Sequence, residues 1–288
     1  MNRIIFTIII SITGSLLYLS CITTAKHDYA RFIPQETGVP GWKLLEERYF
    51  QNNKDKDFPV FLKNSRNIVS VSEAEYVSYS NPPRDVNLTV AVFNNFLSSL
   101  NSYSEILLST EKEIVFLGEL SAVSGEKYVS IHENVLIIVE TSIKDYSVIK
   151  EFQHAVVELL PETNKKVSIP DEVNLFGNKS NLLYLRKGFS HLSEIDNVFI
   201  RFRDNYKLLY KQYSSEEALL RTFANLSGSK MNYTLGKFQE LTYLFKEDDK
   251  GKIALIFYYK DLLLCLIDVD SISNAQSIAL RILTEAEN

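Results

Sequence analysis

Two side chains of the chain, an imidazole and a carboxylate, are close enough in sequence to share a proton. His191 and Glu194 lie three residues apart in the stretch FSHLSEID. An imidazole beside a carboxylate is a common acid–base pair in enzymes. The same letters, HLSE, are also those of an ordinary loop or helix start. The pair is therefore a candidate binding or catalytic site that depends on how the fold orients both side chains.

Two further carboxylates, Asp268 and Asp270, flank Val269 near the C-terminal end of the chain. Alternate residues of a strand share one face, so both carboxylates would lie on one side of a strand end and could form a dyad. They could equally cap the helix that we expect next, and we favour this interpretation. Asp268 and Asp270 complete the set of candidate site residues.

A helix expected before Pro161 has the spacing of a metal site. Glu151, His154 and Glu158 would share one face of it. The apolar residues of the same helix are Phe152, Val156, Leu159 and Leu160. Because this apolar stripe should face the core, the three polar side chains should point into water. We therefore expect no metal.

Motifs that would assign a reaction are missing from the sequence. It contains no Gly-rich phosphate loop, G-x-S-x-G elbow, H-E-x-x-H or C-x-x-C. The acidic stretch KEDDKG lacks the alternating oxygen ligands of a calcium loop, and we expect a hairpin turn there. We expect no cofactor, and a binding protein rather than an enzyme.

The composition is that of a globular protein of ordinary size. Of the 288 residues 45% are hydrophobic and 23% are charged, and the formal net charge is −5. An acidic chain without a dense run of Lys and Arg has no electrostatic means of holding a polyanion. We therefore expect no nucleic-acid partner.

The first residues have the three parts of an export signal. Arg3 precedes an apolar stretch from Ile4 to Leu19, and Ser20 and Cys21 follow it. The end of this stretch, SLLYLSC, resembles the lipobox of bacterial lipoproteins, although a strict lipobox has Leu where this chain has Tyr18. The resemblance implies cleavage before Cys21, a thioether to diacylglycerol at the Cys21 sulfur, and an acylated amino group that holds the chain on a bilayer.

Two alternatives to lipidation stay open. A general signal peptidase could cleave after Ala25, or the segment from Ile4 to about Thr24 could remain as an uncleaved anchor, since it is just long enough to span hydrocarbon. The second cysteine, Cys265, lies in the apolar run DLLLCLIDV, where we expect a small buried side chain.

We expect a lipid-anchored protein of the bacterial cell envelope, at the outer rather than the inner membrane.

Two segments of the chain share a pattern that predicts an internal duplication. Residues 125–161 and 251–283 each begin at a glycine and continue with an apolar run, a polar pair, a second apolar run and an amphipathic helix. The polar pairs, Glu133-Asn134 and Lys260-Asp261, are expected to be hairpin turns. The second apolar runs are so continuous that both faces of those strands should be covered.

The pattern predicts an α+β fold of two similar halves, each an antiparallel meander sheet with helices packed on one face. We expect a lipoprotein signal peptide at 1–20, a tether at 21–40, a first half at 41–165 and a second half at 166–288. The linker between the halves should lie near PETNKKVSIPDEVNLFGNKSN.

The chain also resembles a bacterial exported family that is catalogued only as a domain of unknown function, the 6599 family. The residues that carry this resemblance are Gly41-Trp42 and the stretch YSSEEAL from Tyr213 to Leu219. The resemblance implies export and no reaction. The hypotheses are an envelope lipoprotein that binds a protein, glycan or lipid partner, a periplasmic enzyme whose residues are scattered in sequence, and an accessory carrier of an apolar ligand.

Overall fold

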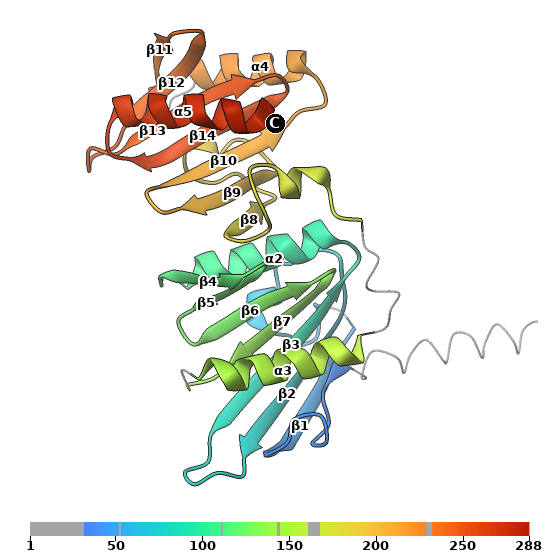
Figure 1. The fold of residues 1–288 in the computed structure, drawn as a ribbon. Coiled ribbons are helices and arrows are strands. Elements are labelled where there is room, and N and C mark those ends of the chain that lie inside the picture. Colours follow the sequence, from blue (N-terminus) through green and yellow to red (C-terminus); the bar gives the residue numbers. More distant parts are fainter. Residues whose placement is uncertain are drawn as a thin grey trace, which may run out of the picture.

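The computed structural model describes residues 32–51, 53–110, 112–142, 145–160, 168–228 and 232–287. The expected signal peptide and Cys21 lie outside these residues. Two halves, each built on a seven-stranded sheet, lie next to each other (Figure 1). Within the described ranges, no helix has both the length and the apolar character needed to cross a bilayer.

The first half consists of three strands, a helix, four strands and a second helix. Its elements are β1 (Trp42–Phe50), β2 (Ile68–Ser78), β3 (Asp85–Phe93), α2 (Phe96–Ser109), β4 (Ile114–Gly118), β5 (Ser121–Ser124), β6 (Lys127–His132), β7 (Val135–Glu140) and α3 (Tyr146–Leu159). The strand order is β1-β2-β3-β7-β6-β5-β4, and all neighbours are antiparallel. A short 3₁₀ turn, η2 (Val60–Leu62), joins β1 to β2.

The second half repeats this topology. Its elements are β8 (Leu182–Leu185), β9 (Val198–Arg203), β10 (Tyr206–Gln212), α4 (Glu216–Ser227), β11 (Thr234–Phe238), β12 (Leu241–Glu247), β13 (Ile253–Tyr259), β14 (Leu262–Val269) and α5 (Ile272–Glu287), with 3₁₀ turns η4 (Asp171–Asn174) and η5 (Ser190–Leu192). The strand order, read from β8, is β8-β9-β10-β14-β13-β12-β11. Each strand of the first half therefore has a counterpart in the same place, which confirms the predicted α+β fold of two similar halves.

Both predicted hairpin turns are present. His132 pairs with Val135 across Glu133-Asn134, and Tyr259 pairs with Leu262 across Lys260-Asp261. In each turn the first residue has a left-handed backbone, with φ of 57° at Glu133 and 51° at Lys260. This conformation fits the right-handed twist of the two strands that the turn connects.

The helices of each half lie on opposite faces of the sheet, and not on one face as predicted. In the first half, Leu136 and Ile138 of β7 share a core cluster with α2, whereas Val135 and Ile137 pack in a separate cluster with α3. Successive residues of a strand point to opposite faces, so the two clusters lie on the two sides of the sheet. Each half therefore has three layers, helix, sheet and helix.

The second half has the same arrangement. Phe223 of α4 packs edge-on against Tyr258 of β13, with ring centroids 4.9 Å apart. Gln276 of α5 donates a hydrogen bond to the hydroxyl of Tyr243, and Tyr243 pairs with Phe257 of β13. Phe257 and Tyr258 are neighbours in the strand and point to opposite faces, so α5 and α4 lie on opposite faces of the sheet. The continuous apolar runs of β7 and β14 explain this layering, because an apolar strand needs cover on both faces.

The helix surfaces follow the predicted apolar stripes with one exception. Phe152 and Val156 of α3 are fully buried, and Leu160, directly after α3, is 4% exposed. In α5, Ala275 and Ala279 are fully buried. Leu159, which we expected in the buried stripe, is 41% exposed. It is the last residue of α3.

Helix α2 joins the two halves. It covers one face of the first sheet and also lies along β8, the edge strand of the second sheet (Figure 1). Two further contacts connect the halves: the rings of Phe116 and Phe202 lie 5.2 Å apart, and Glu119 forms an isolated antiparallel bridge with Ser180. A single cluster of buried residues therefore runs from the first sheet through α2 into the second half.

The described part of the expected tether, residues 32–40, belongs to the folded first half. Phe32, Ile33 and Val39 are buried in the cluster around α3. The hydroxyl of Tyr76 donates a hydrogen bond of 2.7 Å to the carbonyl of Pro34, which fastens this segment to β2. Part of the expected linker, residues 161–167, lies outside the described residues, and η4 behind it packs into the second half through buried Val173.

Candidate functional site

A hollow of about 500 Å³ lies beside the turn between β9 and β10 in the second half. Its walls come from the loop after η4, from the β9–β10 hairpin and from the last turns of α5. We call it the hairpin hollow. It collects residues from three segments that are far apart in the sequence.

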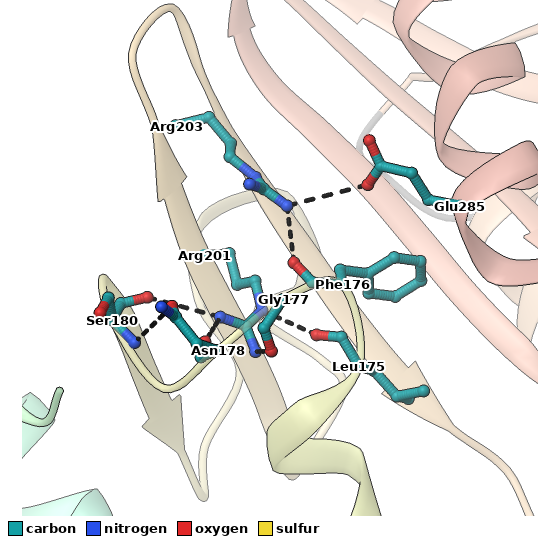
Figure 2. A network of polar contacts seen from close by, with 8 residues as sticks. All are labelled: Leu175, Phe176, Gly177, Asn178, Ser180, Arg201, Arg203 and Glu285. Carbon is teal, nitrogen blue, oxygen red and sulfur yellow. Dashed lines mark hydrogen bonds and ion pairs between the residues drawn. The ribbon is translucent and has the colours of Figure 1, made fainter. Parts of the chain in front are cut away.

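A buried arginine, Arg201 of β9, lines the hairpin hollow and donates hydrogen bonds to the loop that forms one of its walls (Figure 2). The whole residue is only 3% exposed. Its guanidinium donates hydrogen bonds to backbone carbonyl oxygens of the loop 173–180. The acceptors are Val173 at 2.8 Å, Leu175 at 2.8 Å, Gly177 at 3.0 Å, Ser180 at 3.4 Å, and Asn178. Among the described ion pairs none includes Arg201, and the groups next to this buried charge are the loop carbonyls and the side chain of Tyr210.

The carbonyl cage fixes both the arginine and the loop. Five acceptors from one short segment meet the fork of donors that a guanidinium presents, and this holds the loop against β9. Burial lowers the pKa of Arg201, but an ordinary arginine pKa is so far above neutrality that the side chain keeps its charge. The lining of the hairpin hollow therefore contains a fixed positive charge.

Two more arginines line the rim of the hairpin hollow. The Nη2 atom of Arg203 donates a hydrogen bond of 2.6 Å to the carbonyl of Phe176 and lies 3.8 Å from the Glu285 carboxylate (Figure 2). Arg281, on α5 one turn before Glu285, is exposed, and the described contacts give it no hydrogen bond or ion pair. The hairpin hollow thus presents guanidinium donors that no described residue uses.

A second hollow, of about 340 Å³, lies on the other side of the same hairpin and includes Asp268 and Asp270. Lys207 holds Asp268 with an ion pair of 2.5 Å, and Lys252 pairs with Asp270. Each carboxylate therefore has its own cation, and no described contact joins the two carboxylates to each other. A proton-sharing dyad requires the carboxylates to interact directly, which is not the observed arrangement.

The favoured interpretation of Asp268 and Asp270 as helix caps is wrong. Helix α5 begins at Ile272, and the Ser271 hydroxyl oxygen accepts a 3.2 Å hydrogen bond from the amide of Asn274, as an N-cap does. The backbone of Asp268 is left-handed, with φ of 66°, so the strand's alternation is interrupted before its end. Instead of capping α5, the two carboxylates pair with Lys207 of β10 and with Lys252, the residue before β13.

His191 and Glu194 do not form a contact with each other. His191 lies in η5, half-buried, and the hydroxyl of Tyr233 donates a 2.9 Å hydrogen bond to its carbonyl and lies 3.4 Å from its Nδ1 atom. Burial, followed by nearby Lys246, lowers the pKa of His191, while Asp248 and Asp268 act in the opposite direction. Glu194 is exposed, and among the described contacts no hydrogen bond links it to the imidazole.

The helical group expected to face water does so. The imidazole of His154 is 75% exposed and lies 3.5 Å from the Glu158 carboxylate, on the side of α3 opposite Phe152 and Val156. Across the part of the chain that the structure describes, no three His, Cys, Asp or Glu side chains form a group that could hold a metal.

The arginines of the hairpin hollow were not among the site residues predicted from the sequence. Arg201 and Arg203 lie in the strand VFIRFR at alternate positions, so the period of a strand already places them on one face. Arginine inside an apolar strand is rare unless it is paired, which was the available signal. Only the fold could show that Arg281 of α5 joins them.

In comparisons with protein-family models, curated proteins and solved structures, nothing matches this chain.

Proposed function

We propose that this protein is a lipoprotein of a bacterial cell envelope, anchored through acylated Cys21, and that its two-half body is a non-catalytic binding domain. The expected partner is an envelope protein, glycan or lipid, and the membrane is the outer rather than the inner one. The anchor rests on the sequence SLLYLSC. Two acyl chains, at about 0.8 kcal/mol per buried methylene, hold a protein on a bilayer almost permanently.

The observation that carries the binding role is the hairpin hollow with its caged arginine. Binding sites combine a concave surface with a few polar groups that the fold holds in place. Arg201 fixes one wall of the hairpin hollow, while Arg203 and Arg281 keep unused donors at its rim. Among the described contacts, none joins the titratable candidates His191, Glu194, Asp268 and Asp270 to one another as an acid–base pair, which favours binding over catalysis.

A carrier of an apolar ligand is the second candidate. A hollow of about 510 Å³ lies between the segment 33–38 and α3, and its lining includes Ile33, Ala155 and the exposed side chain of Leu159. An alkyl chain would suit this lining better than a polar ligand would. The chain that precedes this hollow leads back to Cys21.

Labelling with radioactive palmitate tests the anchor. Cys21→Ser should abolish incorporation of label and move the protein from the detergent phase to the aqueous phase. Cys265→Ala is the matched control, because this thiol is fully buried and should take no lipid. A Cys21→Ser variant that stays in the detergent phase with its leader intact would show an uncleaved anchor instead. If the wild-type protein takes up no palmitate and is cleaved after Ala25, the protein is secreted without a lipid anchor.

A further inference from the structure

We infer that the hairpin hollow binds the carboxylate of an acidic sugar. This inference rests on the proposed binding role and names the class of ligand. It starts from three segments, the loop 176–181, the β9–β10 hairpin and α5, that place arginines, amides and aromatic rings around one concave surface.

The charge of the hairpin hollow favours an anion. Its lining contains the three arginines Arg201, Arg203 and Arg281 but only two carboxylates, Asp204 and Glu285. The whole chain has a net charge of −5, so this excess of positive charge is local. The charge of Arg201 is buried and cannot be screened by salt as a surface charge is.

Arg281 has the donor geometry that a carboxylate requires, and Arg203 adds single donors. Arg203 uses its Nη2 atom for the Phe176 carbonyl and for Glu285, and its Nε and Nη1 atoms, which have no described partner, point to different sides and can each donate one hydrogen bond. The guanidinium of Arg281 has no described partner. A planar guanidinium presents parallel N–H groups that match the two oxygens of a carboxylate.

The rest of the lining suits a ring that carries hydroxyl groups. Asn181 and Asn205 are exposed at the hairpin hollow, and their side-chain amides have no described hydrogen bond. A side-chain amide both donates and accepts, as a sugar hydroxyl does. The half-buried rings of Phe176 and Tyr206 offer apolar surface to the faces of a sugar ring, and about 500 Å³ lies within the range of small-ligand sites.

Isothermal titration of the detergent-solubilised full-length protein with glucuronate, glucose and inorganic phosphate tests this inference. Glucuronate should bind at least about tenfold more tightly than glucose, because only glucuronate forms charge-assisted hydrogen bonds with the arginines. It should also bind more tightly than phosphate, which has no ring for the amides and aromatic side chains. Equal affinity for glucose, tighter binding of phosphate, or no binding of glucuronate would each overturn the inference.

Two substitutions in the hairpin hollow should act in opposite directions. Arg281→Gln should weaken glucuronate binding about tenfold or more, because it removes a free guanidinium. Glu285→Gln should strengthen binding by up to about fivefold, because it removes the carboxylate that competes for Arg203. Arg221→Gln, on the exposed face of α4, should change nothing. Effects of the same sign for both substitutions would overturn the inference. Palmitate labelling reports on the anchor independently of all these outcomes.

Discussion

The Oγ atom of Ser104 in α2 accepts a hydrogen bond of 2.8 Å from the backbone amide of Tyr184 in β8. Next to it, the side-chain oxygen of Asn101 accepts one of 2.8 Å from the amide of Arg186. An edge strand has amides without a partner in its own sheet, and a polar face of α2 supplies acceptors for two of them. This explains why a helix at the centre of the molecule contains buried serine and asparagine.

The counterpart of α2 in the second half cannot repeat this contact. Counted from the helix N-caps Asn95 and Ser215, the positions of Asn101 and Ser104 are occupied by Arg221 and Ala224 in α4. Arginine has no acceptor atom and alanine has no polar atom. A strand that packed on α4 as β8 packs on α2 would therefore find no side-chain acceptor at these two positions.

Removing the acceptors of α2 should weaken the junction of the halves. Ser104→Ala and Asn101→Leu should each lower the free energy of unfolding by about 1–3 kcal/mol, because each leaves a buried amide without a partner. Urea denaturation measures this loss. Ser277→Ala, which removes an exposed hydroxyl that binds only the Ser273 carbonyl, should stay within about 0.5 kcal/mol. Equal effects of Ser104→Ala and Ser277→Ala would contradict this role of α2.

The two sides of α3 should respond very differently to substitution. Val156 is fully buried beneath the helix, so Val156→Asp should destabilise the protein by several kcal/mol through an unpaired buried charge. Glu158 is exposed and pairs only with His154 at 3.5 Å, so Glu158→Ala should cost less than about 0.5 kcal/mol. Thermal unfolding compares the two variants. Similar midpoints would be incompatible with the position of α3 on the sheet.

The carbonyl cage should depend on the fork of Arg201. Arg201→Met should lower the free energy of unfolding by about 2 kcal/mol or more, because buried carbonyls lose their donors. It should also speed amide hydrogen exchange in residues 173–180, which hydrogen-exchange mass spectrometry resolves. Arg201→Lys should rescue only part of both effects, because an ammonium cannot reach five separated acceptors. Arg281→Gln, at the exposed rim, should leave the exchange of this loop unchanged.

His191 should make stability depend on pH. Its folded-state pKa lies below the ordinary value of 6.5 because of burial, so folding favours the neutral imidazole. As the pH falls, the imidazole of the unfolded chain is protonated at a higher pH than that of the folded chain. The free energy of unfolding therefore decreases as the pH drops from about 7.5 to about 5. His191→Gln should flatten this part of the curve in urea titrations at several pH values. His154→Gln, at an exposed position, should leave the slope as in the wild type.

The sequence by itself determined the duplicated hairpin and helix at the end of each half, but not the strands β1, β2, β8 and β9. Strand period, polar turn pairs and apolar helix stripes depend on neighbours within a few residues, and these placed the turns at Glu133-Asn134 and Lys260-Asp261 correctly. The uninterrupted apolar runs of β7 and β14 even required cover on both faces. The position of that cover was nevertheless predicted wrongly, because a periodicity shows that a face is buried but not which helix buries it.

Only the tertiary structure decided which charged groups meet. The sequence suggests a dyad or helix caps for Asp268 and Asp270, but in the fold each pairs with a lysine from another segment, Lys207 or Lys252. Likewise, nothing local to Arg201 shows that the loop 173–180 would turn its carbonyls inward. Electrostatic partners depend on distance in space, and distance in space between remote segments follows from how the sheets and helices pack.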